Sequence, residues 1–320
     1  MSRLLLSVVF ALALAAMACR DGGSDDPDGG PGPGDGRTPD SGTGYPAPRD
    51  NLVPAVGSAA TFDLACWNIE NFPKDPSSAA LAADLITSLK LDVVIVEEVA
   101  SEAAWNELVA RLPEHEGILS PHVYTSTSYQ KLGVLYRKPL VSVGQLRLLF
   151  NGDTVPFPRP PIQVSIVVDD GQHARLAIDL IGLHLKAGVT TDDRTRRTEA
   201  VVKLDNHLRS QIGGGGEDEV VMMGDYNEVF TDTASQAVFS PLLVGSPALF
   251  TLQTAPYAQG GGITYLGFGG KAIDHVVTSA GLAAELAGGD LAVPRLDQTF
   301  GGYQGLLSDH LPVVLRVPLR

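Results

Sequence analysis

Short apolar runs alternate with amphipathic segments along the chain from residue 61 onward. The runs at 61–67, 91–96 and 175–185 are typical of strands, and the second is apolar almost throughout, as a strand covered on both faces requires. The segments 77–90 and 192–209 place apolar residues three or four positions apart, which predicts helices. No shift in composition indicates a linker after residue 61. The pattern predicts one α/β or α+β domain whose helices lie outside its sheets.

The runs at 220–223, 273–277 and 313–317 also predict strands. Together with the three above they make six strands that carry, at or near one end, side chains that can bind a metal or transfer a proton. These side chains are Asn68, Glu97 with Glu98, His184, Asp225 with Asn227, Asp274 with His275, and Asp309 with His310. Such groups are costly to bury unless they are paired, hydrogen-bonded or bound to a metal, so their meeting at one end of a sheet would form a site. Carboxylate and amide oxygens suit hard ions such as Mg²⁺, Mn²⁺ or Ca²⁺, and Asp with His suits acid–base chemistry near neutral pH.

The N-terminal 52 residues predict an export signal followed by a tether. Residues 1–19 form an apolar stretch that is short for a membrane span, which indicates a signal peptide. The small residues before Cys19 resemble the cleavage box of bacterial lipoproteins, in which Cys19 would become the lipidated first residue. The alternatives are cleavage near Ala18, which gives a freely secreted protein, and an uncleaved anchor. Gly, Pro and Asp dominate the next segment, so we predict a disordered tether at 20–52 and a folded domain at 53–320.

The charge and the cysteine content exclude several classes of protein. The chain has 23 Lys and Arg against 37 Asp and Glu, a net charge of −14, so it has no strong general attraction for nucleic acid or anionic lipid. A local cationic groove is compatible with this balance. The two cysteines, Cys19 and Cys66, exclude a disulfide scaffold and a zinc site built from cysteines. We expect Cys66 to be a buried apolar residue. The glycine-rich segment 260–270 is not a G-x-G-x-x-G that opens a helix, so we assign no dinucleotide site there.

Seven short motifs follow one another along the chain. They are WNIENF (67–72), VIVEEV (94–99), GVLYRK (133–138), GLHLKAG (182–188), MGDYNEV (223–229), IDHVVTS (273–279) and SDHLPV (308–313). In this order they resemble the motifs of the endonuclease/exonuclease/phosphatase superfamily, which includes deoxyribonuclease I, exonuclease III-like repair enzymes and neutral sphingomyelinases. The resemblance extends over about residues 65–320. It implies a four-layer sandwich of two mixed β-sheets packed face to face with helices outside, and Mg²⁺- or Mn²⁺-dependent hydrolysis of a phosphoester by water.

The resemblance also implies roles for the residues at the strand edges. The metal ligands would be Glu98, Asn68 and Asp309. Asp225 would orient or deprotonate the attacking water, and Asn227 would hydrogen-bond a phosphate oxygen. His310 would be the catalytic histidine, oriented by Asp274, and His184 would be a second catalytic group that binds phosphate or acts as an acid.

Further residues receive supporting roles from the same comparison. Candidate phosphate contacts are Lys186, Arg194 and Arg197. Gln130 is nearest to the position of the glutamate that partners the second histidine in the family, so we expect it to accept a hydrogen bond from His184. Two neighbours of site residues receive structural assignments instead: Glu97 as a solvated neighbour of Glu98, and His275 as a residue that points away from Asp274.

Family membership leaves the substrate open. The first hypothesis is a secreted or surface-tethered nuclease, which would be monomeric and reach the membrane only through a lipid on Cys19. The second is a lipid phosphodiesterase or phosphatase, for which 150–162 and 241–250 are the candidate membrane-contacting segments. The third is an inactive binding module, which the intact set of site residues disfavours.

Overall fold

The computed structural model describes residues 44–124, 129–245 and 248–320. The predicted signal peptide and most of the predicted tether lie outside these residues. Within the described part of the chain, no helix is both long and apolar enough to cross a membrane.

The strands of the described residues form two mixed sheets. The first has six strands, in the order β12 (Asp290–Ala292), β13 (Val313–Pro318), β1 (Thr61–Phe72), β2 (Val93–Val99), β4 (Lys131–Arg137) and β3 (His115–Leu119). The second has seven, in the order β10 (Phe250–Leu252), β11 (Asp274–Ser279), β9 (Val220–Asp225), β8 (Leu176–His184), β7 (Ile162–Val168) and β5 (Val141–Val143), with β6 (Arg147–Leu148) paired to β7. Each sheet contains one parallel pair, β1 with β2 and β8 with β9.

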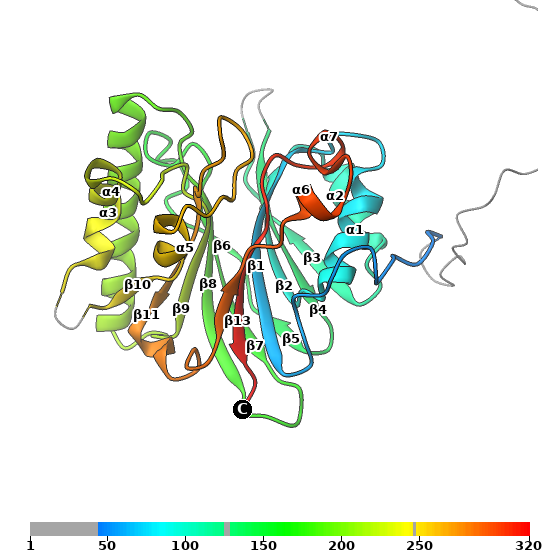
Figure 1. Ribbon diagram of the computed structural model, residues 1–320. Helices are drawn as coiled ribbons and strands as arrows, with labels where there is room; N and C mark the ends of the chain where they lie inside the picture. The colour runs from blue at the N-terminus through cyan, green and yellow to red at the C-terminus, as the bar shows by residue number, and fades with distance from the viewer. Residues whose placement is uncertain (1–43, 125–128, 246–247) are drawn as a thin grey trace, which may run out of the picture. The chain divides into compact units, whose positions relative to one another are not determined.

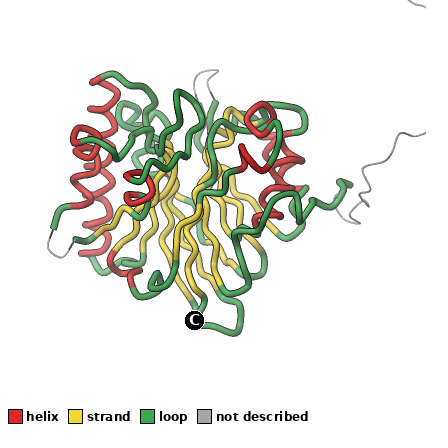
Figure 2. Tube along the Cα trace, in the orientation of Figure 1, coloured by secondary structure: helices red, strands yellow, loops and turns green. Residues whose placement is uncertain are grey.

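Helices cover the outer face of each sheet (Figures 1 and 2). Helices α1 (Ser78–Leu89) and α2 (Glu102–Ala110) pack on the first sheet, and α3 (Thr191–Gly213) and α4 (Thr233–Leu243) pack on the second. The connections contain α5 (Ala255–Gln259), the 3₁₀ turn η1 (Ala280–Ala283), α6 (Leu296–Thr299) and α7 (Tyr303–Leu306). This arrangement confirms the predicted four-layer sandwich.

The alternation of side chains along the central strands builds three apolar layers. In β1, Phe62, Leu64 and Cys66 face the second sheet, whereas Ala65 and Trp67 face the helices of the first sheet. This follows from the period of two in a strand. The core between the sheets therefore includes Cys66, which is fully buried as expected, and burial raises the pKa of its thiol well above the usual range.

The folded domain begins earlier than residue 53. The backbone N–H and the Nε–H of Arg49 each donate to the buried carboxylate of Asp84 at 2.7 Å. The N–H of Leu52 donates to Ser88 Oγ at 2.9 Å. Both partners lie on α1. The assignment of 20–52 to a tether is therefore wrong for its last residues, because a buried carboxylate on α1 fixes Arg49 to the domain.

Candidate active site

Strand pairing brings most of the predicted polar residues together. Asn68, in the last part of β1, pairs in register with Glu97 on β2. On the second sheet, Asp225 at the end of β9 pairs with His184 on one side and with Asp274 on the other. Because the two sheets pack face to face, these two groups of strand ends meet and form one site.

The carboxylate of Asp225 lies at the centre of this site. Its Oδ2 accepts a hydrogen bond from Asn68 Nδ2 at 3.2 Å and lies 3.5 Å from His184 Nε2 and 3.9 Å from His310 Nε2. Its Oδ1 accepts from the backbone N–H of Asn227 at 2.7 Å. Burial, and then the nearby Asp274, raise the pKa of Asp225 to about 7, so this carboxyl group can exchange a proton near neutral pH.

His310 and Asp274 form a buried pair. The Nδ1–H of His310 donates to Asp274 Oδ2 at 2.9 Å, and Thr264 Oγ1 donates to the same oxygen at 2.5 Å. This hydrogen bond orients the ring so that Nε2 of His310 lies toward Asp225, at 3.9 Å from Oδ2. Burial lowers the pKa of His310, but the charge of Asp274 and its hydrogen bond, followed by Asp225 and Asp309, outweigh burial and raise it to about 10. The imidazole is therefore a cation at neutral pH.

The carboxylates of Glu98 and Asp309 lie on the more open side of the site, with side chains 14% and 24% exposed. Glu98 has a φ of 61°, a strained value for a bulky residue, which turns its side chain out of the regular alternation of β2. Its Oε1 accepts from Asn68 Nδ2 at 3.2 Å and its Oε2 from the N–H of Asn71 at 2.9 Å. Asn68 thus holds the carboxylates of Glu98 and Asp225 side by side.

This donor set fits a hard divalent cation. Ligand atoms of Asp225, Asp274 and His310 lie within 4.8 Å of one another. Asp274 is already bonded to His310 and Thr264, so the oxygens best able to hold an ion are those of Glu98 and Asp309, with Asn68 beside them. Oxygen ligands of this kind suit Mg²⁺, Mn²⁺ or Ca²⁺. A cation here would also offset the repulsion among the carboxylates.

The prediction that Glu97 is a solvated neighbour of Glu98 is wrong. Its side chain is fully buried rather than solvated, and its Oε2 accepts the N–H of Asp225 at 3.0 Å. In β2, Val93 and Ile95 face the second sheet, and the same period of two carries Glu97 to that side. Burial, followed by the negative charges of Asp274 and Asp225, raises the pKa of Glu97 well above the usual range. The sequence already contained this signal in the alternation 93, 95, 97.

The predicted partnership of Gln130 with His184 is also wrong. Gln130 Oε1 accepts from Arg159 Nη2 at 2.6 Å, and its Nε2 donates to Asn71 at 2.7 Å. His184 Nδ1 is buried without a hydrogen-bond partner among the described residues. Burial, and then Arg159 and His310, lower the pKa of His184 well below its usual value, so this histidine is neutral.

The three predicted phosphate contacts all have protein partners. Lys186 Nζ lies 2.8 Å from Asp193, and Arg194 Nε lies 3.1 Å from Glu228. Arg197 is 2% exposed, and its Nη2 donates to Glu228 at 2.8 Å. Its Nη1 donates to the carbonyls of Lys186 and Gly188 at 2.9 Å each.

Arg197 therefore joins the segment after β8 to the segment after β9. A phosphate-binding role for it is contradicted, because its guanidinium is enclosed by these partners. His275 behaves as expected: its Nδ1 bonds Thr254 Oγ1 at 2.7 Å and its Nε2 donates to the carbonyl of Glu228 at 2.9 Å, away from Asp274.

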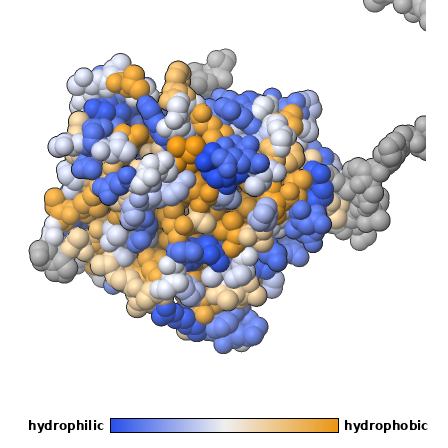
Figure 3. Space-filling view, viewed as in Figure 1, coloured by the Kyte–Doolittle hydropathy of each residue, from blue (hydrophilic) through white to orange (hydrophobic). Residues whose placement is uncertain are grey.

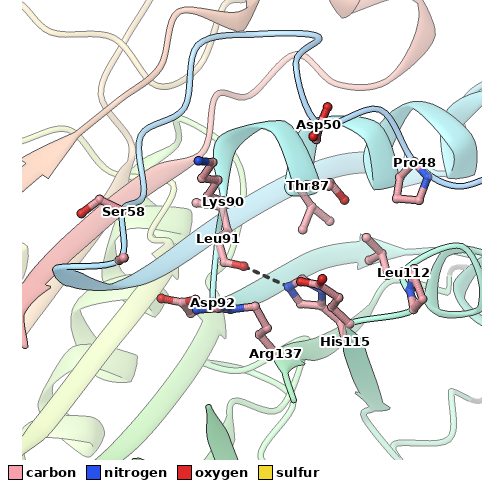
Figure 4. Close-up of a pocket in the computed structure, with 14 residues that line it drawn as sticks. Pro48, Asp50, Ser58, Thr87, Lys90, Leu91, Asp92, Leu112, His115 and Arg137 are labelled. Carbon is pink, nitrogen blue, oxygen red and sulfur yellow. Dashed lines mark hydrogen bonds and ion pairs between the residues drawn. The ribbon is translucent and has the colours of Figure 1, made fainter. Parts of the chain in front are cut away.

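Two cavities lie at opposite ends of β2. One, of about 640 Å³, opens over Glu98, Asp225, Asp309 and His310. The other, of about 530 Å³, is lined by Leu91 and Asp92 just before β2 (Figure 4). There His115 Nε2 donates to the carbonyl of Leu91 at 2.9 Å, and Arg137 pairs with Asp92 at 2.6 Å. Of these two cavities, the first contains most of the residues that the sequence predicts for catalysis and metal binding.

The fold and the site define a phosphoesterase of the deoxyribonuclease I type. The model of the endonuclease/exonuclease/phosphatase family matches residues 65–310. The chain belongs to this family, whose members depend on a divalent metal. No curated protein sequence matches the chain.

Solved structures share the fold at low sequence identity. Humanized TDP2 from D. rerio is 17% identical with a TM-score of 0.58, covering 81% of this chain and 99% of its own. The 3′ phosphatase NExo from Neisseria, bound to a product DNA hairpin, is 14% identical with a TM-score of 0.56, covering 79% and 98%. A mannosyl-6-phosphatase from Bacteroides thetaiotaomicron is 13% identical with a TM-score of 0.55, covering 80% and 99%.

Proposed function

We propose that the protein is a Mg²⁺- or Mn²⁺-dependent phosphodiesterase that cleaves nucleic acid outside the cytoplasm. One observation carries this proposal: Asp225 lies within 4 Å of both His184 Nε2 and His310 Nε2, next to the open carboxylates of Glu98 and Asp309. A proton acceptor, a cationic imidazole and a metal-binding set are thus adjacent. Together they can activate water and stabilise charge at phosphorus.

Each residue has a defined part in the proposed mechanism. Glu98 and Asp309 would hold the metal, which would neutralise phosphate charge and acidify water when bound. Asn68 would orient the Glu98 carboxylate for this role, because its Nδ2 donates to Glu98 and its Oδ1 accepts from the N–H of Glu70. Asp225 orients the attacking water and accepts its proton as the new P–O bond forms. The P–O bond to the leaving group breaks in the same reaction, and the leaving oxygen takes up a proton from solvent. His310, held by Asp274, stabilises the charge on the phosphoryl oxygens, and Asn227 donates to one of these oxygens. Neutral His184 hydrogen-bonds the phosphate from the other side of Asp225.

Nucleic acid is favoured over lipid for two reasons. Among the neighbours in fold, NExo is bound to a product DNA hairpin. The largest apolar side chains of the segments expected to contact a membrane are turned inward: Phe157 is 1% exposed and stacks on Phe150 at 4.7 Å, and Leu242 is fully buried in α4. Each segment exposes one valine among its described residues, Val155 at 58% and Val244 at 56%. On the face shown in Figure 3, hydrophobic and hydrophilic residues are interspersed. Because another neighbour in fold is a mannosyl-6-phosphatase, a phosphomonoester is the second candidate substrate.

Attachment through a lipid on Cys19 is also part of the proposal. The support is the predicted signal peptide, the small residues before Cys19 and the tether-like segment that follows it. The protein would then present its domain on the outer side of a membrane as a monomer.

Parallel digestion assays test the substrate. The purified protein, with Mg²⁺ or Mn²⁺, is incubated with supercoiled plasmid, single-stranded DNA, RNA, sphingomyelin and sugar phosphates, and His310→Ala is the matched control. Cleavage of DNA or RNA by the wild type alone supports the proposal. Activity confined to lipid or to a phosphomonoester would refute nucleic acid as the substrate but would still support the proposed active site. No activity on any of these substrates would favour a binding module.

A further inference from the structure

The glycine-rich segment 260–270 borders the catalytic cavity, and part of it forms a closed turn. The N–H groups of Thr264 and Tyr265 both donate to the carbonyl of Lys271 at 2.8 Å, and the N–H of Lys271 donates back to Tyr265 at 3.0 Å. The base of this turn is tied to the site, because the N–H of Leu266 donates to the carbonyl of Asp309 at 2.7 Å. We call residues 265–271 the mouth loop.

The mouth loop presents an aromatic side chain to solvent. Phe268 is 91% exposed and has a φ of 47°, a left-handed conformation that is unfavourable for a bulky residue. The two residues after it, Gly269 and Gly270, also have positive φ values of 86° and 76°. Phe268 lines the same cavity as Asp225 and His310. An exposed, strained aromatic residue at the edge of a catalytic cavity has no structural role among the described contacts, and it offers a flat apolar face to a ligand.

The mouth loop also carries a free cation. Among the described residues that line the cavity, the lysine and arginine side chains are Arg194, Arg197 and Lys271, and the two arginines are paired with Glu228. The cationic imidazole of His310 is paired with Asp274. Lys271 is exposed and has no ion-pair partner among the described residues. It is therefore the cation in this lining that is free to meet an anionic substrate. Lys271 can bind a phosphate outside the metal site, and Phe268 can bind a flat ring of the same ligand.

We propose that the mouth loop binds the nucleotide next to the scissile phosphate, with Phe268 stacked on its base and Lys271 paired with its other phosphate. This inference rests on the proposed nuclease function and specifies its substrate as single-stranded or unpaired nucleic acid. A base inside a duplex is already stacked on its neighbours, whereas an unpaired base is free to stack on an aromatic side chain. A lipid chain is a poorer occupant, because Val189 is the one other large apolar residue that is exposed at this cavity in the described part of the chain.

Oligonucleotide kinetics test the stacking contact. The variants are Phe268→Ala, Phe268→Trp and Lys271→Gln, with Val189→Ala as the control, because Val189 is equally exposed at 91% and lines the same cavity but cannot stack as a ring. The substrates are a single-stranded DNA oligonucleotide and the same oligonucleotide with abasic residues on both sides of the cleavage site. Thermal unfolding confirms that each variant is folded.

For the DNA with bases, we expect Phe268→Ala to raise KM by roughly 5- to 150-fold, the range that stacking of one base supports. Phe268→Trp should retain the wild-type KM. On the abasic substrate, Phe268→Ala and the wild type should have equal KM values. Lys271→Gln should raise KM on both substrates, since both contain phosphate.

Two results would overturn the inference, and they are distinguishable. If the wild type cleaves the oligonucleotide and Phe268→Ala has the KM of wild type and of Val189→Ala, the stacking contact is refuted and the nuclease function stands. If the wild type cleaves no oligonucleotide under conditions in which it hydrolyses another phosphoester, the proposed function fails and the inference fails with it.

Discussion

Replacing Arg197 by alanine tests the connection between the two catalytic segments. The guanidinium of Arg197 donates to Glu228 through Nε at 3.1 Å and Nη2 at 2.8 Å, and to the carbonyls of Lys186 and Gly188 through Nη1. The side chains of Arg197 and Glu228 are 2% and 4% exposed. Removing one partner of a buried ion pair costs about 3–5 kcal/mol, because the other charge is left without compensation.

Arg194 adjusts this magnitude and supplies the control. It pairs with the same carboxylate at 3.1 Å, but its own side chain is 42% exposed. Because Arg194 still compensates Glu228 in the Arg197→Ala variant, we expect a loss at the lower end of the range, about 3 kcal/mol in the free energy of unfolding. For Arg194→Ala we expect less than about 1 kcal/mol, the usual value for a solvent-exposed ion pair. Arg197→Lys should fall between them, since an ammonium cannot reproduce the forked contacts.

Urea denaturation of the three variants and the wild type measures these differences. The turnover number should also fall in Arg197→Ala, because the segments that Arg197 joins follow His184 and Asn227 directly. If Arg197→Ala lowers the free energy of unfolding by less than about 1 kcal/mol, or by as much as Arg194→Ala does, Arg197 is not the buried connection between the two segments.

Three further predictions concern pH, catalysis and attachment. Burial lowers the pKa of His275 from 6.5 to about 4, so the stability that it contributes when neutral is present above pH 6.5 and is lost as the pH falls toward 4. This loss amounts to about 3 kcal/mol, and urea denaturation at pH 7 and pH 4 should show a smaller loss for His275→Gln than for wild type; equal losses would contradict it. Asp225→Asn should lower kcat by at least about 100-fold with an unchanged circular dichroism spectrum, and an unchanged kcat would remove Asp225 from the mechanism. Cys19→Ser should move the protein from the membrane fraction to the soluble fraction on immunoblots, and retention in the membrane fraction would rule out attachment through Cys19.

Local patterns in the sequence predicted the elements that carry the site. The apolar run at 91–96 becomes β2, and the spacing in 192–209 becomes most of α3. The polar residues at strand ends come together because parallel strands place their carboxyl ends at one edge of a sheet. The strands and helices are predictable because apolar residues recur along the sequence with the period of a strand, two residues, or of a helix, 3.6 residues.

Contacts between distant loops could not be predicted in the same way. Gln130 pairs with Arg159 instead of His184, and Arg197 pairs with Glu228 instead of a ligand. Each of these choices depends on which loops meet in space, and the polar side chains involved have several chemically equivalent partners. The error at Glu97 is different, because the alternation along β2 already placed its side chain between the sheets.

The central claim is that a divalent metal and His310 together hydrolyse a phosphodiester, and metal-dependent cleavage of single-stranded DNA tests it most directly. The purified wild type, His310→Ala and His173→Ala are compared after EDTA treatment and after addition of Mg²⁺ or Mn²⁺; His173 is an exposed histidine that pairs with Asp170 before β8. We predict that EDTA abolishes cleavage, that metal restores it in the wild type and in His173→Ala, and that His310→Ala stays inactive. Cleavage that persists in EDTA, or that is equal in His310→Ala and the wild type, would contradict this mechanism.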